Sequence, residues 1–66
     1  MPIFITLHSG DIPYMVNVSN ILFITTTEVC GKPCSVVKFY RSEIWVDETP
    51  ETIKSMIQSY ADYYNK

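Results

Sequence analysis

The chain has 66 residues, of which 47% are hydrophobic and 14% aromatic, and five basic and seven acidic side chains give it a formal net charge of −2. This composition argues against disorder, and the lack of a basic block disfavours tight non-specific binding to a phosphate backbone. No stretch approaches a membrane span, and the start lacks a basic leader region, so we expect one small cytoplasmic domain over residues 1–66 with no membrane span.

The first two thirds of the chain predict five short strands separated by turns. Apolar and polar residues alternate at the start, and Gly10 can adopt the positive φ of a tight turn into the second strand. The later strands are rich in β-branched and aromatic residues. We expect a loop over residues 28–34, where Gly31 and Pro33 interrupt the pattern. The predicted strands are residues 3–8, 12–18, 21–27, 35–40 and 43–47.

The last third of the chain predicts one amphipathic helix, at about residues 50–64. Thr49 suits the N-cap, Pro50 suits the first helical position, and Glu51 suits the positive end of the helix dipole. The fold class is therefore α+β: a five-stranded antiparallel meander, strongly bent or barrel-like, packed by this C-terminal helix. The residues of its apolar stripe are Ile53, Met56, Ile57, Tyr60, Ala61 and Tyr64.

Motifs that carry chemistry are few. Cys30 and Cys34 leave three states open: two reduced thiols, a disulfide across the loop, or a metal cluster in which two copies of the chain each supply both thiolates. The single histidine, His8, ends a strand, and no serine of the chain lies in a nucleophile motif that would make it a catalytic partner of His8. The acidic pair Asp47 and Glu48 is interpreted as a complement to the helix dipole. We expect no catalytic residue, no metal site and no cofactor, and hence not an enzyme.

The aromatic residues give a better signal of function. Trp45 shares its strand face with Glu43 and Asp47, which is unusual for a core position. One interpretation is a surface for self-association or for a partner, because Trp and Tyr are enriched at binding hot spots. The other is that the sheet closes and Trp45 fills the barrel. The predicted partner-binding residues are Trp45, Tyr40 and Phe4.

A set of residues spread over nearly the whole chain forms a recognisable pattern: Ile5, Leu7, Gly10, Asn17, Ile21, Ile24, Val46, Glu48, Thr49, Glu51, Ile53, Ile57 and Tyr60. This pattern resembles that of the small bacterial flagellar and swarming-motility proteins. The resemblance implies a short, cytoplasmic, non-enzymatic protein. The chain differs from that pattern at Arg41–Ser42 and in the segment from Cys30 to Cys34. A weaker similarity is to the LytTR-type DNA-binding domain.

The sequence thus predicts a small non-enzymatic interaction or regulatory module that associates with itself as a homo-oligomer and binds a protein partner. The first alternative is a nucleic-acid-binding module of the LytTR-like type, carried by Lys32, Lys38 and Arg41 with Tyr40; the acidic net charge makes nucleic acid the weaker hypothesis. The second alternative is a metal-binding protein that uses the intermolecular cysteine cluster.

Overall fold

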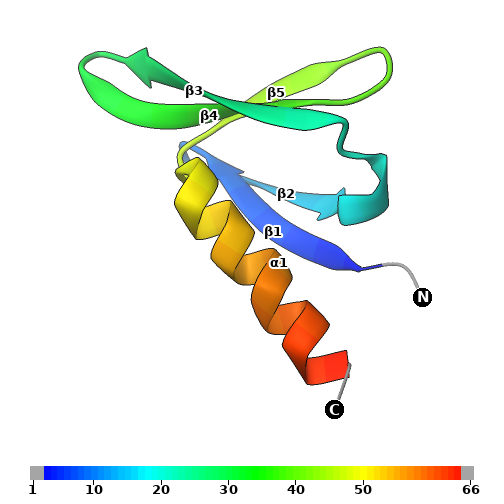
Figure 1. The fold of residues 1–66 in the computed structure, drawn as a ribbon. Coiled ribbons are helices and arrows are strands. Elements are labelled where there is room, and N and C mark those ends of the chain that lie inside the picture. The colour runs from blue at the N-terminus through cyan, green and yellow to red at the C-terminus, as the bar shows by residue number, and fades with distance from the viewer. Residues whose placement is uncertain (1–2, 65–66) are drawn as a thin grey trace.

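A computed structural model of the chain describes residues 3–64, and the side chain of Tyr64 lies outside the described set. Five antiparallel strands in meander order are followed by one helix, which confirms the α+β class (Figure 1). The strands form two sheets that are not closed into a barrel: β1 pairs with β2, and β3, β4 and β5 form the second sheet in that order. The elements are β1 (Phe4–Ser9), β2 (Ile12–Asn17), β3 (Phe23–Val29), β4 (Lys32–Lys38), β5 (Glu43–Val46) and α1 (Pro50–Tyr64).

The meander divides into two sheets at a short 3₁₀ turn, Val18–Asn20. The side chain of Asn17 caps this turn by accepting a hydrogen bond of 3.0 Å from the backbone N–H of Ser19. Asn bonds neighbouring backbone groups in this way readily, so the strand ends where the capping side chain replaces the sheet ladder. After this turn, β3 lies in the other layer and pairs with β4, rather than continuing the sheet of β1 and β2 (Figure 1).

The segment from residue 28 to residue 34 differs from the expected loop, because both strands continue to a two-residue turn. Val29 pairs with Lys32, and the turn residues Cys30 and Gly31 have φ values of 52° and 78°. Two successive positive φ values are typical of the type I′ turn that best matches the twist of a hairpin. Pro33 is tolerated in the central strand because its nitrogen points toward β5, which ends before reaching it: the last pair is Ser35 with Val46.

The hydrophobic core lies where the two sheets meet the first half of α1. The helix begins as predicted: the hydroxyl of Thr49 accepts a 3.3 Å hydrogen bond from the backbone N–H of Thr52. Ile53 is completely buried, whereas Tyr60 remains 39% exposed, so the apolar stripe is best covered near the start of the helix. Side chains from both sheets and the helix make up the core cluster: Ile5, Leu7, Val16, Val37, Val46 and Ile53.

Candidate functional site

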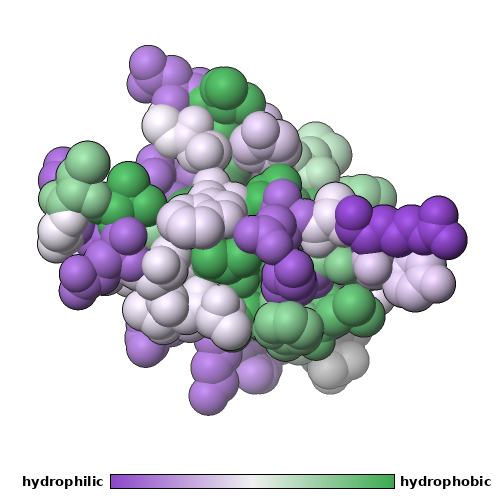
Figure 2. All heavy atoms as spheres, turned by 90° about the horizontal axis from the view of Figure 1, so that it is seen from above, coloured by the Kyte–Doolittle hydropathy of each residue, from purple (hydrophilic) through white to green (hydrophobic). Residues whose placement is uncertain are grey.

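The face of the three-stranded sheet that points away from the core is the candidate functional surface. We call it the outer face. The side-chain alternation of paired strands places every second residue there. In Figure 2, viewed from the side of this sheet, hydrophobic surface lies among pale and polar groups. The outer face consists of Phe23, Thr25, Thr27 and Val29 on β3, Lys32, Cys34, Val36 and Lys38 on β4, and Glu43 and Trp45 on β5.

Trp45 is held in a defined position on the outer face. Its indole N–H donates a 2.9 Å hydrogen bond to Glu43, and the ammonium group of Lys38 donates a 2.7 Å hydrogen bond to the other carboxylate oxygen. These two donors, with the positive charge of Lys38, hold the pKa of Glu43 below its ordinary value. The indole is 47% exposed, so Trp45 does not fill the interior of a barrel. A large ring fixed at its polar end and open to solvent is a favourable binding contact.

An open hollow of about 760 Å³ lies beside Trp45. The hairpin turn at Cys30 forms one part of its wall, and the turn at Gly10 forms another. Cys34 and Val46 are buried residues on its lining, whereas Lys32 is exposed. The lining of the hollow therefore mixes apolar residues with the charged residues Lys32 and Asp47, a combination that suits an amphipathic side chain from another molecule.

The other two predicted partner-binding residues line different hollows. Phe4 is 45% exposed and lies at a hollow of about 380 Å³ with Phe39 and Ile44, between the two sheets. Tyr40 is 81% exposed in the turn between β4 and β5, at a third hollow that also contains Phe39, and the guanidinium of Arg41 lies 5.3 Å from its ring centroid. The structure therefore does not gather Trp45, Tyr40 and Phe4 at one hollow.

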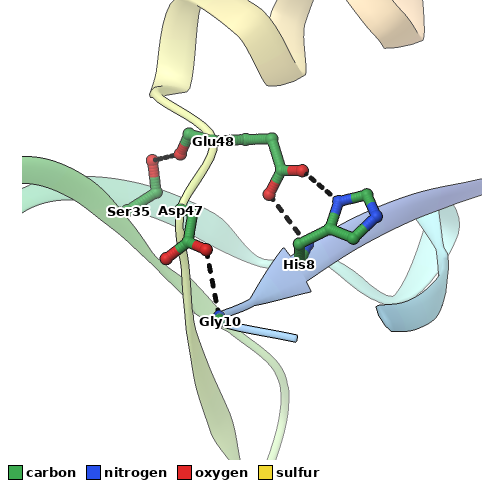
Figure 3. Close-up of polar contacts among 5 residues, drawn as sticks. All are labelled: His8, Gly10, Ser35, Asp47 and Glu48. Atoms are coloured by element: carbon green, nitrogen blue, oxygen red, sulfur yellow. Dashed lines mark hydrogen bonds and ion pairs between the residues drawn. The ribbon is translucent and has the colours of Figure 1, made fainter. Parts of the chain in front are cut away.

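A polar junction ties the helix start to both sheets (Figure 3). Glu48 accepts a 2.9 Å hydrogen bond from the backbone N–H of His8, and its second oxygen lies 2.6 Å from His8 Nδ1. Asp47 accepts a 3.0 Å bond from the backbone N–H of Gly10 and donates its own N–H to the carbonyl of His8 at 2.7 Å. On the other sheet, the buried hydroxyl of Ser35 donates a 2.7 Å bond to the carbonyl of Glu48.

Two opposing effects act on the pKa of Glu48. Partial burial, the largest single effect, raises it, whereas the hydrogen bonds from the backbone and the side chain of His8, with smaller contributions, lower it; the lowering effects prevail in sum, so the pKa lies below its ordinary value. The carboxylate is therefore the stable form of Glu48 in the folded chain, and it holds β1 against the start of α1.

The junction was missed from the sequence, where Asp47 and Glu48 are interpreted only as complements to the helix dipole. His8 and Glu48 lie 40 residues apart, and no local pattern connects them. The available signal was weak: a histidine at a strand end beside a glycine turn, and an acidic pair directly ahead of a helix.

The cysteines occupy different environments. Cys30 is exposed in the turn, Cys34 is buried in β4, and both thiols are free. Lys32 directly follows the turn, and Cys34 lies two residues beyond it, about 7 Å further along the strand. The side chains of Cys30 and Cys34 are therefore not opposite one another. Within residues 3–64, no three side chains of His, Cys, Asp or Glu are grouped so that they could hold a metal ion.

Comparisons with protein-family models, with curated proteins and with solved structures yield no match to this chain. The part of the chain that the structure describes contains no helix with the length and apolarity needed to cross a bilayer.

Proposed function

We propose that this chain is a small non-enzymatic interaction module that associates with itself. We propose further that it binds a protein partner through the outer face around Trp45. The observation that carries the proposal is the positioned and half-exposed indole of Trp45 beside an open hollow with both apolar and charged residues in its lining. A surface of this kind binds without a large loss of side-chain entropy, because the Glu43 contact already restricts the ring.

The polar groups support a non-enzymatic role. The His8 ring faces Glu48, and the Ser35 hydroxyl donates to a backbone carbonyl, so these groups are engaged in holding the sheets and the helix together. The same reasoning favours a protein partner over nucleic acid. Lys38 is paired with Glu43, and Arg41 lies against Tyr40, so two of the three cations proposed to contact phosphates already have partners within the chain.

The self-association part is tested by light scattering of the full chain at increasing concentration, with a mass above the 7.6 kDa of one chain expected.

The partner part is tested by affinity capture from the source cells, with the wild-type chain and Trp45→Ala as baits. Ile12→Ala is the matched control because Ile12 is also apolar and 57% exposed but lies on β2. We expect captured proteins to be lost with Trp45→Ala and retained with Ile12→Ala. Identical capture by all three baits would contradict the role of Trp45.

The resemblance to flagellar and swarming-motility proteins, like cytoplasmic location, stays a prediction. Capture of a flagellar component by the wild-type chain but not by Trp45→Ala would support it.

A further inference from the structure

The strands that end the two sheets differ in how well their free edges are protected. On β2, the Gly10 turn makes Ser9 and Ile12 the first hydrogen-bonded pair, so Pro13 is a residue whose backbone faces outward. Proline offers no N–H, and it interrupts that edge. β5 is short, with four residues. The backbone N–H of Asp47, the next one on its outward side, already donates a hydrogen bond to the carbonyl of His8. Both edges are therefore poor templates for another strand.

The edge of β3 lacks these protections. The two-residue turn makes Val29 and Lys32 a hydrogen-bonded pair, and hydrogen-bonded and non-hydrogen-bonded pairs then alternate along the strand. The backbone groups of Ile24, Thr26 and Glu28 consequently point away from β4. Residues 23–29 include neither proline nor lysine, the two residues that most often protect an edge. Five of the seven side chains are exposed: Phe23, Thr25, Thr26, Glu28 and Val29.

We propose that the β3 edge binds the β3 edge of a second copy of this chain, antiparallel and around a two-fold axis at Thr26. This inference rests on the proposed function, for which it supplies the mode of self-association. Thr26 lies opposite the second copy's Thr26, and Ile24 lies opposite the second copy's Glu28. Each outward-facing residue then meets another outward-facing residue, as the antiparallel ladder requires.

The register follows from the sequence of the strand. With the axis at Thr26, all seven residues of β3 are paired, and Phe23 packs beside the second copy's Val29 on the outer face. These two side chains are 53% and 46% exposed in the single chain, so the pairing covers apolar surface. Moving the axis to Glu28 would shorten the overlap and set two carboxylates directly opposite each other, which is unfavourable.

The product is one six-stranded sheet. A two-fold axis at right angles to the sheet keeps both outer faces on the same side, with the two Trp45 rings near its opposite edges. The dimer therefore presents two copies of the proposed partner site on one surface.

The first test measures the mass of the full chain by sedimentation velocity in reducing buffer. We expect a dimer, twice the 7.6 kDa of one chain. Thr26→Pro removes an outward-facing N–H that β4 does not use, so the chain should keep its circular dichroism spectrum while its dimer dissociation constant rises at least tenfold. Met15→Pro is the matched control: Met15 is 76% exposed and has the equivalent outward position on β2, so its dimer should persist. If Thr26→Pro does not fold, Thr26→Lys replaces it, because two ammonium groups opposite each other should weaken the dimer as strongly.

The second test fixes the register by disulfide formation in a Cys30→Asn background, where the remaining Cys34 is buried. Thr26→Cys should yield a covalent dimer under mild oxidation, because the two thiols lie opposite each other. Glu28→Cys should yield little, since the two copies of residue 28 lie about 13 Å apart along the strands.

The outcomes separate this inference from the proposed function. A dimer that persists in Thr26→Pro and in Thr26→Lys, or equal crosslinking at positions 26 and 28, would overturn β3 pairing and leave self-association by another surface. A mass of one chain at every concentration would overturn both the pairing and self-association, while capture of a partner through Trp45 would still stand.

Discussion

Replacement of Glu48 by alanine should destabilise the chain far more than replacement of its partner His8. Glu48→Ala removes two hydrogen bonds: one from the backbone N–H of His8 at 2.9 Å and one from its ring at 2.6 Å. The Glu48 side chain is only 16% exposed, and a hydrogen bond to a charged group contributes about 1.5–3 kcal/mol. His8→Ala keeps the backbone bond and loses only a contact of a ring that is 51% exposed, which contributes about 0.5–1 kcal/mol.

We therefore expect losses in the free energy of unfolding of about 2–3 kcal/mol for Glu48→Ala and under about 1 kcal/mol for His8→Ala. Urea unfolding at pH 7, followed by far-ultraviolet circular dichroism, measures both. The double variant completes a cycle that isolates the contribution of the side-chain pair. Equal losses for the two single variants would refute the reasoning, because they would mean that the backbone bond contributes nothing.

The same pair sets a pH dependence. The pKa of Glu48 is lowered in the folded chain, so its contribution is fully present above the unfolded value of about 4.5 and is lost as the pH falls through the folded pKa. Wild-type stability should therefore decrease below about pH 4.5, and Glu48→Gln should flatten that decrease. Glu51→Gln, on the exposed first turn of α1, is the control and should leave the slope intact. A wild-type profile that matches Glu48→Gln would contradict the assignment.

Three further predictions concern the turn, the core and the outer face. Cys30→Asn should raise the free energy of unfolding by about 1 kcal/mol, measured by urea unfolding, because Asn tolerates the φ of 52° better than Cys; an unchanged value would contradict strain at this turn. Ile53→Ala should cost about 2–5 kcal/mol in the same assay because Ile53 is completely buried, and a loss below about 1 kcal/mol would argue against this packing of α1. Glu43→Ala should free the indole of Trp45, so that fluorescence anisotropy falls and acrylamide quenching rises; unchanged values would show that Glu43 does not hold the ring.

Local signals predicted much of the fold. Gly10 marks the first hairpin, and Thr49 with Pro50 marks the start of α1, because a positive φ and an N-cap depend on a few neighbouring residues. The hairpin at Cys30 and Gly31 was missed because proline usually argues against a central strand. Pro33 is tolerated in the central strand only because β5 ends before it would need a hydrogen bond from residue 33. The length of β5 cannot be predicted from the residues around Pro33.

The candidate site was predictable only in part. The alternation along β5 places Trp45 beside Glu43, and the structure shows the hydrogen bond between them. The separation of the three residues was not predictable from local patterns: Phe4 lies on β1, in the other sheet from Trp45, and Tyr40 lies in the turn between β4 and β5, beyond the paired residues of those strands.

The two ends of the described chain lie away from the outer face, beneath the sheet of β3, β4 and β5 in Figure 1. This arrangement matters for engineering. An affinity handle, a fluorophore or a surface attachment joined at either end should leave the outer face unobstructed. The chain is therefore suited to immobilised binding measurements, and it could serve as a display scaffold on which the residues around Trp45 are varied while both attachment points stay fixed.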